Sequence, residues 1–285
     1  MEIIKTPEHF RSPMPFNYPA HQKGLLIEEY AYEYLTTNAD NIDTDLVYLP
    51  ILWTSYHCKH NYGKNTSELQ KFVDTLPKDK TYFTIVQYDD GTLVDMPNCI
   101  VFSCCGNKGR GLEDIPIPVL CDRHNVKRND EHEFLSSFIG RIGNKVRPAM
   151  FEKLQGKENF HITDSGDNTE LFLDIMKKTL FSLCPRGYGI TSFRMYESME
   201  LGCIPIYIVG DDDDYWIPFS DYIDWNQLAI LIKESEIDKI PEIISNMSQK
   251  EIDSRLKYIK ENYESHFTLK GALDNVKKIL ENKTV

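Results

Sequence analysis

The fold of this chain is encoded most clearly in the stretch LFSLCPRGYGITSFRMYESMELGCIPIYIV, which runs from Leu180 to Val209. Two apolar runs, Leu180–Cys184 and Cys203–Val209, have the composition of buried strands. Between them lie a turn with two glycines and a helix that we expect to begin at Thr191 or Ser192. The order strand, glycine turn, helix, strand predicts a βαβ unit with parallel strands and a right-handed crossover.

The start of the expected helix has the chemistry of an anion site. Ser192 is a good N-cap, because its hydroxyl accepts a hydrogen bond from a free amide of the first turn. The remaining free amides and the helix dipole attract an anion. Gly187 and Gly189 lack a Cβ, so that a ligand can approach the backbone closely. The pattern is therefore suited to a phosphate group.

Charged residues on both sides of the turn favour the same ligand. Arg186 and Arg194 supply forked donors that match the geometry of phosphate. Glu197 follows three residues after Arg194 on the helix and could accept hydrogen bonds from ribose hydroxyls. Arg194 and Glu197 could equally form a surface ion pair, and the glycine turn could be purely structural. The pattern is neither the dinucleotide fingerprint nor a Walker loop.

Taken together, the segment CPRGYGITSFRMYESMELGCIPIYI and the later IPFSDYIDW resemble the signature of the exostosin family of inverting glycosyltransferases. The resemblance implies a GT-B fold, which has two Rossmann-like α/β domains with a cleft between them. It also implies a nucleotide-sugar donor, usually a UDP-sugar, and a glycan acceptor. The residues that would then hold the nucleotide diphosphate are Arg186, Gly187, Ser192, Arg194 and Glu197.

The first half of the chain carries looser matches to the same family. Asp45–Pro50 resembles its Ala-Asp-Leu-Phe-Phe-Val-Pro landmark, and Gly111–Pro118 resembles its Asp-Ile-x-Ile-Pro run. Independently of the family, the apolar run Leu46–Trp53 predicts a buried parallel strand. A further strand is expected over Tyr82–Gln87, which is rich in residues that favour strands.

Candidate catalytic bases follow that second strand. Asp89 and Asp90 lie at its carboxyl end, where side chains of an open α/β sheet point toward a ligand crevice. Asp90 precedes Gly91 in a turn, which favours Asp89 as the residue that takes the proton of the acceptor hydroxyl. The reserve candidates are Glu28, His21 and His57.

A second strand–glycine–helix segment opens the other half of the chain. Phe134–Ile139 is expected to be a strand, and Gly140 ends it. The basic residues that follow, Arg141, Lys145 and Arg147, precede a helix, and cations are disfavoured at a helix N-terminus. We therefore expect Arg141 or Arg147 to make a second phosphate contact, although solvated first-turn residues would show the same pattern.

These observations divide the chain of 285 residues into three parts. We expect residues 1–130 to form a Rossmann-like domain on the acceptor side and residues 131–265 to form the donor domain, as the resemblance implies. Residues 266–285 form a helix that packs back toward the first domain. Other helices are expected at Leu25–Leu35, Ser67–Thr75, Asn168–Lys178, Ser235–Asn246 and Gln249–Tyr263, the last with a capping box from Ser248 and Glu251.

Composition excludes several other classes of protein. The formal net charge of −12 argues against a general nucleic-acid or anionic-membrane binder. The seven cysteines show no Cys-x-x-Cys pair, so reduced thiols are expected. No signal peptide or apolar run long enough to cross a bilayer is evident. We expect a soluble, cytoplasmic enzyme resembling a viral or microbial member of the family, in a host cytoplasm if viral.

Two rival functions stay open at this stage. Asp211–Asp214 could hold a divalent metal on a donor diphosphate, as in GT-A transferases, although a run of like charges is usually a solvated loop. The chain could also be a non-catalytic partner that binds nucleotide sugars or glycans. The favoured hypothesis is a hexosyl- or pentosyltransferase that uses a UDP-sugar, with UDP-xylose as the first guess, and that requires no metal or other cofactor.

Overall fold

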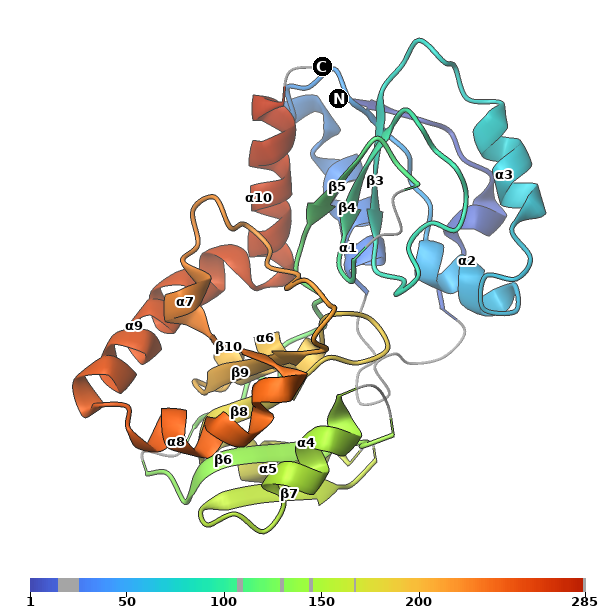
Figure 1. The fold of residues 1–285 in the computed structure, drawn as a ribbon. Coiled ribbons are helices and arrows are strands. Elements are labelled where there is room, and N and C mark those ends of the chain that lie inside the picture. The colour runs from blue at the N-terminus through green and yellow to red at the C-terminus, as the bar shows by residue number, and fades with distance from the viewer. Residues whose placement is uncertain (15–25, 107–109, 129–130, 144–145, 167, 284–285) are drawn as a thin grey trace. The chain divides into compact units, whose positions relative to one another are not determined.

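A computed structural model describes residues 1–14, 26–106, 110–128, 131–143, 146–166 and 168–283. The chain folds into two compact units (Figure 1). Unit 1 comprises Met1–Asp122 together with Thr268–Val285, and unit 2 comprises Arg123–Phe267. The sequence placed the corresponding boundaries after residues 130 and 265.

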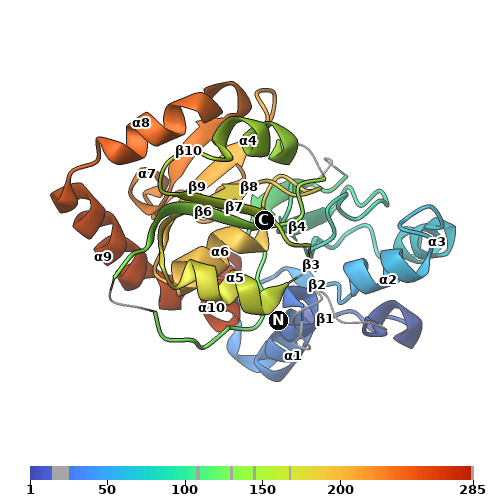
Figure 2. The same cartoon turned by 90° about the horizontal axis from the view of Figure 1, so that it is seen from below.

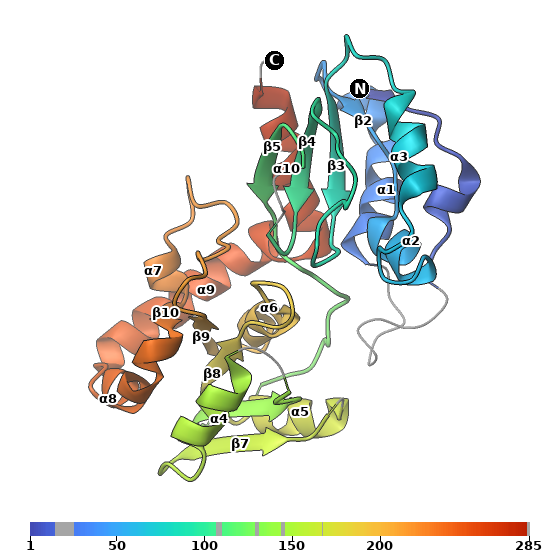
Figure 3. The ribbon, with the colours of Figure 1, turned by 45° about the vertical axis from the view of Figure 1, so that its right-hand side comes forward.

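Unit 1 is built on a five-stranded parallel sheet whose strands lie side by side in the order of the sequence (Figure 3). The strands are β1 (Glu2–Ile3), β2 (Val47–Tyr48), β3 (Tyr82–Val86), β4 (Cys99–Ser103) and β5 (Glu113–Pro116). The helices are α1 (Ile27–Thr37), α2 (Trp53–Lys59), α3 (Ser67–Asp74) and α10 (Leu269–Asn282), with short 3-10 turns at Glu8–Arg11 and Ala39–Asn41. All residues of β3 and β4 are buried, as expected for a parallel sheet covered on both faces.

The C-terminal helix α10 belongs to unit 1 although it is separated from the rest of that unit by 145 residues of chain, 123–267. The Tyr34 hydroxyl of α1 donates a hydrogen bond to Asp274 Oδ1 at 2.7 Å. The Thr44 hydroxyl donates to the carbonyl of Leu280 at 3.0 Å. Buried Leu273, Val276 and Leu280 form the apolar stripe of this helix.

Unit 2 is a second five-stranded parallel sheet with a different strand order, β10-β9-β8-β6-β7. The strands are β6 (Phe134–Gly140), β7 (Phe160–Asp164), β8 (Thr179–Pro185), β9 (Ile204–Val209) and β10 (Ile230–Lys233). The helices are α4 (Arg147–Leu154), α5 (Thr169–Met176), α6 (Phe193–Glu200), α7 (Trp225–Leu228), α8 (Ile240–Ser245) and α9 (Gln249–His266), with a 3-10 helix at Glu234–Lys239. Figure 2 shows α4 and α8 on one face of this sheet and α5 and α6 on the other.

The winding of unit 2 reverses at β6. From β6 the chain first adds β7 on one side and then returns to add β8 on the other. This is the 2-1-3-4-5 order of doubly wound sheets, in which the crevice for a ligand opens at the carboxyl ends of the two strands flanking the reversal. Here those strands are β6 and β8.

The predicted α/β architecture is confirmed. Strand β8, helix α6 and strand β9 form the expected unit, and β8 pairs with β9 in parallel. Ser192 is the N-cap of α6, and its hydroxyl accepts from the Arg194 amide. Two Rossmann-like units in one chain fit the GT-B class.

Some predicted elements are wrong in detail. Leu46–Trp53 is not one strand, because only Val47 and Tyr48 pair in the sheet and Trp53 begins α2. Pro50 has no amide hydrogen to continue the ladder. The single helix expected over Ser235–Asn246 is a 3-10 helix followed by α8, which begins at Ile240–Pro241. Strands β7 and β10 and the short α7 were not predicted.

Within the described ranges, every helix is too short or too polar to cross a bilayer.

Candidate functional site

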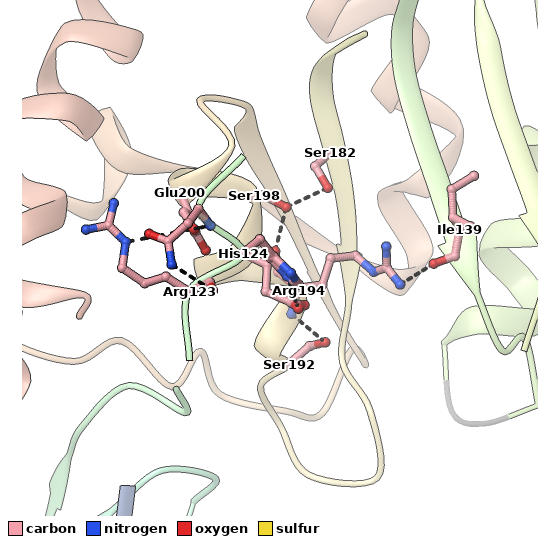
Figure 4. Close-up of polar contacts among 10 residues, drawn as sticks. Arg123, His124, Ile139, Ser182, Ser192, Arg194, Ser198 and Glu200 are labelled. Carbon is pink, nitrogen blue, oxygen red and sulfur yellow. Dashed lines mark hydrogen bonds and ion pairs between the residues drawn. The ribbon is translucent and has the colours of Figure 1, made fainter. Parts of the chain in front are cut away.

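The carboxyl ends of β6 and β8 bring together the two glycine-containing loops that the sequence singled out. Ser137 lies opposite Ser182 in the parallel register, so that Gly140 and Pro185 end at the same edge of the sheet. Helix α6 begins just after this edge and is tied to β8 by Ser198, whose hydroxyl contacts Ser182 Oγ at 2.7 Å (Figure 4). The first turn of α6 is thereby fixed at the point where the winding reverses.

The guanidinium of Arg194 is buried at this point. It lies over the rings of Phe138 and Phe172, with its carbon 4.5 and 5.0 Å from the two ring centroids. Its Nη2 donates to the carbonyl of Ile139 (Figure 4). Nε and Nη1 are buried without a hydrogen-bond partner among the described residues, and burial lowers the pKa of Arg194. Two N–H donors of the buried Arg194 cation thus lack an acceptor among the described residues, which is costly in a buried site.

Gly140 makes room for this arginine. A Cβ at position 140 would lie 2.6 Å from Arg194 Nη2, closer than nonbonded atoms approach. Because aromatic rings hold the guanidinium on two sides, it cannot move aside without losing these contacts. Glycine is needed here for the close approach of Arg194 across the end of β6.

Arg186 has a different environment from Arg194. Its guanidinium pairs with Asp213 and also donates to the carbonyls of Tyr188 at 2.9 Å and Gly189 at 3.2 Å. These contacts stabilise the loop that follows β8. In this structure Arg186 shapes the glycine turn, and its assignment to the diphosphate remains a prediction.

Two members of the aspartate run, Asp211 and Asp213, make hydrogen bonds within the protein. Asp213 accepts from Arg186 and from the Gly210 amide at 3.0 Å, and Asp211 accepts from the Ser235 amide at 3.0 Å. Partial burial opposes ionisation of Asp213, but Arg186 outweighs this effect and lowers the pKa of Asp213. No group of three or more His, Cys, Asp or Glu side chains in the described part of the chain is arranged to hold a metal ion.

Arg147 links the loops that follow β6 and β8. Its Nε donates to the carbonyl of Arg186 at 3.2 Å, and its Nη1 donates to the carbonyl of Arg141 at 3.0 Å. A Cβ on Gly187 would lie 3.5 Å from Arg147 Nη2. The structure therefore brings Arg141, Arg147 and Gly187 to the same edge as Arg194, whereas Lys145 lies outside the described residues.

Glu197 lies one turn into α6 and is paired with a residue that the sequence did not single out. His124 Nε2 donates to Glu197 Oε1 at 2.8 Å, and both side chains are nearly inaccessible to solvent. Burial would lower the pKa of His124, but the hydrogen bond and charge of Glu197 outweigh it and raise the pKa. Sequence spacing could not indicate this pairing, because the two residues are 73 positions apart in the chain.

In unit 1 the candidate bases follow β3 as expected. Asp89 and Asp90 lie in a turn closed by the Gly91 amide, which donates to the Tyr88 carbonyl at 2.9 Å. Both aspartates are half-buried. The Asp89 carboxylate contacts the thiol of Cys105, whose pKa burial raises far above its usual value.

The reserve bases are internal where the structure describes them. Glu28 is fully buried and accepts from the Thr54 amide at 2.9 Å and the Gln87 amide at 2.7 Å, and burial raises its pKa to about 7. His57 donates to the Thr92 carbonyl at 2.9 Å, and burial lowers its pKa to about 4. His21 lies outside the described residues.

A comparison with known protein families identifies the family of the chain. The model of the exostosin GT47 domain matches residues 102–247, just over half of the chain. The chain belongs to the exostosin GT47 family. The match covers β6 to β10 and includes every residue named for the site in unit 2. The order of these strands in the sheet is shown by the structure alone.

Individual relatives of the exostosin GT47 family are distant. The chain is 25% identical over 208 residues to the exostosin-1 homolog of Caenorhabditis elegans, covering 59% of this chain and 54% of that protein. It is 30% identical over 108 residues to the probable glucuronosyltransferase GUT1 of Oryza sativa subsp. japonica, covering 38% of this chain and 25% of that protein. The chain thus spans about half or less of the length of these curated relatives.

Among solved structures, the chain is similar to the pneumococcal O-GlcNAc transferase GtfA, crystallised with UDP and GlcNAc. The TM-score is 0.38 at 14% identity, over 89% of this chain and 60% of that chain.

The contacts of Asp213 predict that this member of the aspartate run differs from its neighbours. Asp213→Asn leaves the buried Arg186 without its carboxylate, which should cost about 1–3 kcal/mol of unfolding free energy. Asp212 is exposed, so that Asp212→Asn should change stability by less than about 0.5 kcal/mol. Urea unfolding of the two variants measures the difference. Equal effects would contradict the role assigned to Asp213.

The His124–Glu197 pair predicts a pH-dependent contribution to stability. Because the folded pKa of His124 is raised above its ordinary value of 6.5, the contribution is complete below that pH and is lost as pH rises through the folded pKa. Urea unfolding at about pH 6 and about pH 9 should show this loss in the natural chain. His124→Gln should remove this part of the pH dependence, and an unchanged profile in the variant would contradict the assignment.

Proposed function

We propose that this chain is a glycosyltransferase that moves a sugar from a UDP-sugar to a hydroxyl of a glycan acceptor. The observation that carries the proposal is the buried guanidinium of Arg194 at the reversal point of unit 2, with two donors lacking a partner. Membership of the exostosin GT47 family and the capped N-terminus of α6 support the same conclusion. Among donors, UDP-xylose is the first to be tested.

The proposed reaction is a single in-line displacement that inverts the anomeric carbon. The acceptor oxygen attacks that carbon, the bond to the diphosphate oxygen breaks, and the hydroxyl proton passes to Asp89 or, as the alternative, Asp90. UDP departs with two negative charges spread over its terminal phosphate, and fixed donors must stabilise them. Arg194 and the first amides of α6 are the proposed donors, with Arg141 or Arg147 from the loop after β6.

In this reaction, side chains and helix amides stabilise the departing UDP. We therefore propose that no metal or other cofactor is required. Support comes from Asp213 and Asp211, whose carboxylates accept hydrogen bonds from Arg186, Gly210 and Ser235. To bind a metal ion, Asp211 and Asp213 would have to give up those contacts.

The function is tested by measuring UDP binding and donor hydrolysis by the purified chain, with and without a chelator. The donors are UDP-xylose, UDP-galactose, UDP-glucuronic acid and UDP-N-acetylglucosamine, and GDP serves as the control for the base. We expect UDP binding that survives the chelator and slow hydrolysis of one donor. Binding without hydrolysis or transfer would favour a non-catalytic partner, and binding lost with the chelator would favour the aspartate run as a metal site.

Arg194→Lys provides the sharpest variant. Lysine keeps the charge but lacks the planar fork, so UDP affinity should fall about tenfold or more, the amount expected for a lost charge-assisted hydrogen bond. Lys250→Ala removes a positive charge from an exposed site at the start of α9 and should leave the affinity unchanged. Isothermal titration of both variants with UDP decides the matter, and natural affinity in Arg194→Lys would refute the assignment of Arg194.

A further inference from the structure

The segment Arg123–Asn125, which begins unit 2, lies against helix α6 (Figure 4). We call these three residues the α6 strap. The Asn125 amide donates to Glu200 Oε1 at 2.9 Å, and Arg123 Nε lies 3.8 Å from the same oxygen. His124 makes the third contact, to Glu197 one turn earlier. The strap therefore engages two carboxylates on one side of the helix.

The His124–Glu197 contact differs from the others in its burial. The two side chains are 4% and 10% exposed, whereas the Arg123 side chain is 41% exposed. A buried carboxylate stays ionised only where hydrogen bonds or charges compensate for lost hydration. His124 supplies such a hydrogen bond, and it donates from Nε2 both when protonated and when neutral with its hydrogen on that nitrogen.

The pair is continuous with the proposed nucleotide site. The ring of Phe172 lies 5.8 Å from the His124 ring and also carries the guanidinium of Arg194 at 5.0 Å. Glu197 follows Arg194 by three residues on α6, and its charge favours the charged form of that arginine. His124, Phe172, Arg194 and Glu197 thus form one packed cluster beside the end of β6.

We infer that His124 is a positioning residue for nucleotide binding, which fixes the Glu197 carboxylate so that it accepts hydrogen bonds from the ribose diol of UDP. The inference rests on the proposed function. A glutamate side chain has three rotatable bonds, and holding one carboxylate oxygen removes most of that freedom before the ligand arrives. Acidic residues bind ribose hydroxyls in other nucleotide folds, because an ionised carboxylate is a strong hydrogen-bond acceptor.

The experiment compares UDP with 2′,3′-dideoxy-UDP, which keeps the base and diphosphate but lacks the diol. Calorimetry or competition titration is carried out on the natural chain and on His124→Ala, His124→Gln and Arg123→Gln. Arg123→Gln disturbs the exposed part of the strap and serves as the matched control. Thermal melting in the absence of ligand confirms that each variant is folded.

We expect His124→Ala to lose about tenfold or more in affinity for UDP and to bind 2′,3′-dideoxy-UDP as the natural chain does. His124→Gln places an amide donor near the position of Nε2 and should recover most of the UDP affinity. Arg123→Gln should bind both ligands normally. A positioning role predicts this dependence on the diol, which a general loss of packing would not produce.

Three results with the His124 variants would overturn the inference. His124→Ala could bind UDP normally, it could lose both ligands equally, or His124→Gln could be no better than His124→Ala. If the natural chain bound UDP and its dideoxy analogue equally, the link between Glu197 and ribose would fall while the proposed function stood. If the natural chain bound no UDP, the proposed function would fall and this inference with it.

Discussion

The burial of one guanidinium at the end of β6 is the constraint on which the rest of unit 2 depends. Removing a cation from water is costly, and Arg194 recovers part of that cost from one carbonyl, two aromatic faces and the nearby charge of Glu197. The side chain at position 140 must be absent for this arrangement to exist. Nε and Nη1 of Arg194 face no acceptor among the described residues, and the proposed diphosphate would supply one.

Two arginines that look equivalent in the sequence have different environments in the fold. Arg186 and Arg194 both flank the glycine turn, and both have guanidinium groups suited to phosphate. Arg186 donates to Asp213 and to two loop carbonyls and thereby stabilises the turn. The partner of Arg186 comes from 27 residues further along the chain, and spacing around the turn contains no information about it.

Sequence patterns predicted the elements whose apolar runs are long and fully buried. Strands β8 and β9 are buried along their whole length and were expected from Leu180–Cys184 and Cys203–Val209. Strand β7 was missed because none of its five residues is fully buried, so that it carries no clear apolar signal. The prediction of a single strand over Leu46–Trp53 was wrong, because apolar composition alone cannot separate a strand from the buried start of a helix.

The candidate site was predictable to the extent that it depends on local chemistry. The N-cap Ser192, the glycines and the basic residues after β6 could all be named, since each acts through its own loop or helix turn. The partners that orient them could not. Phe138, Phe172 and His124 reach the site through the packing of α5, β6 and the α6 strap onto α6, and such contacts appear only once the sheet order is known.

The strand orders of the two units bear on the proposal that unit 2 binds the nucleotide. In unit 1 the described strands follow one another across the sheet without a reversal, so no switch-point crevice arises at their carboxyl ends. The most strongly perturbed carboxylate there, Glu28, is enclosed by Thr54 and Gln87 and ties α1 to α2 and the end of β3. That contact holds the backbone two residues before Asp89, and the Asp89–Asp90 turn follows it at the same end of β3. The proposal therefore assigns the nucleotide to unit 2, whose sheet has a reversal point, and the acceptor side to unit 1, whose described strands have none.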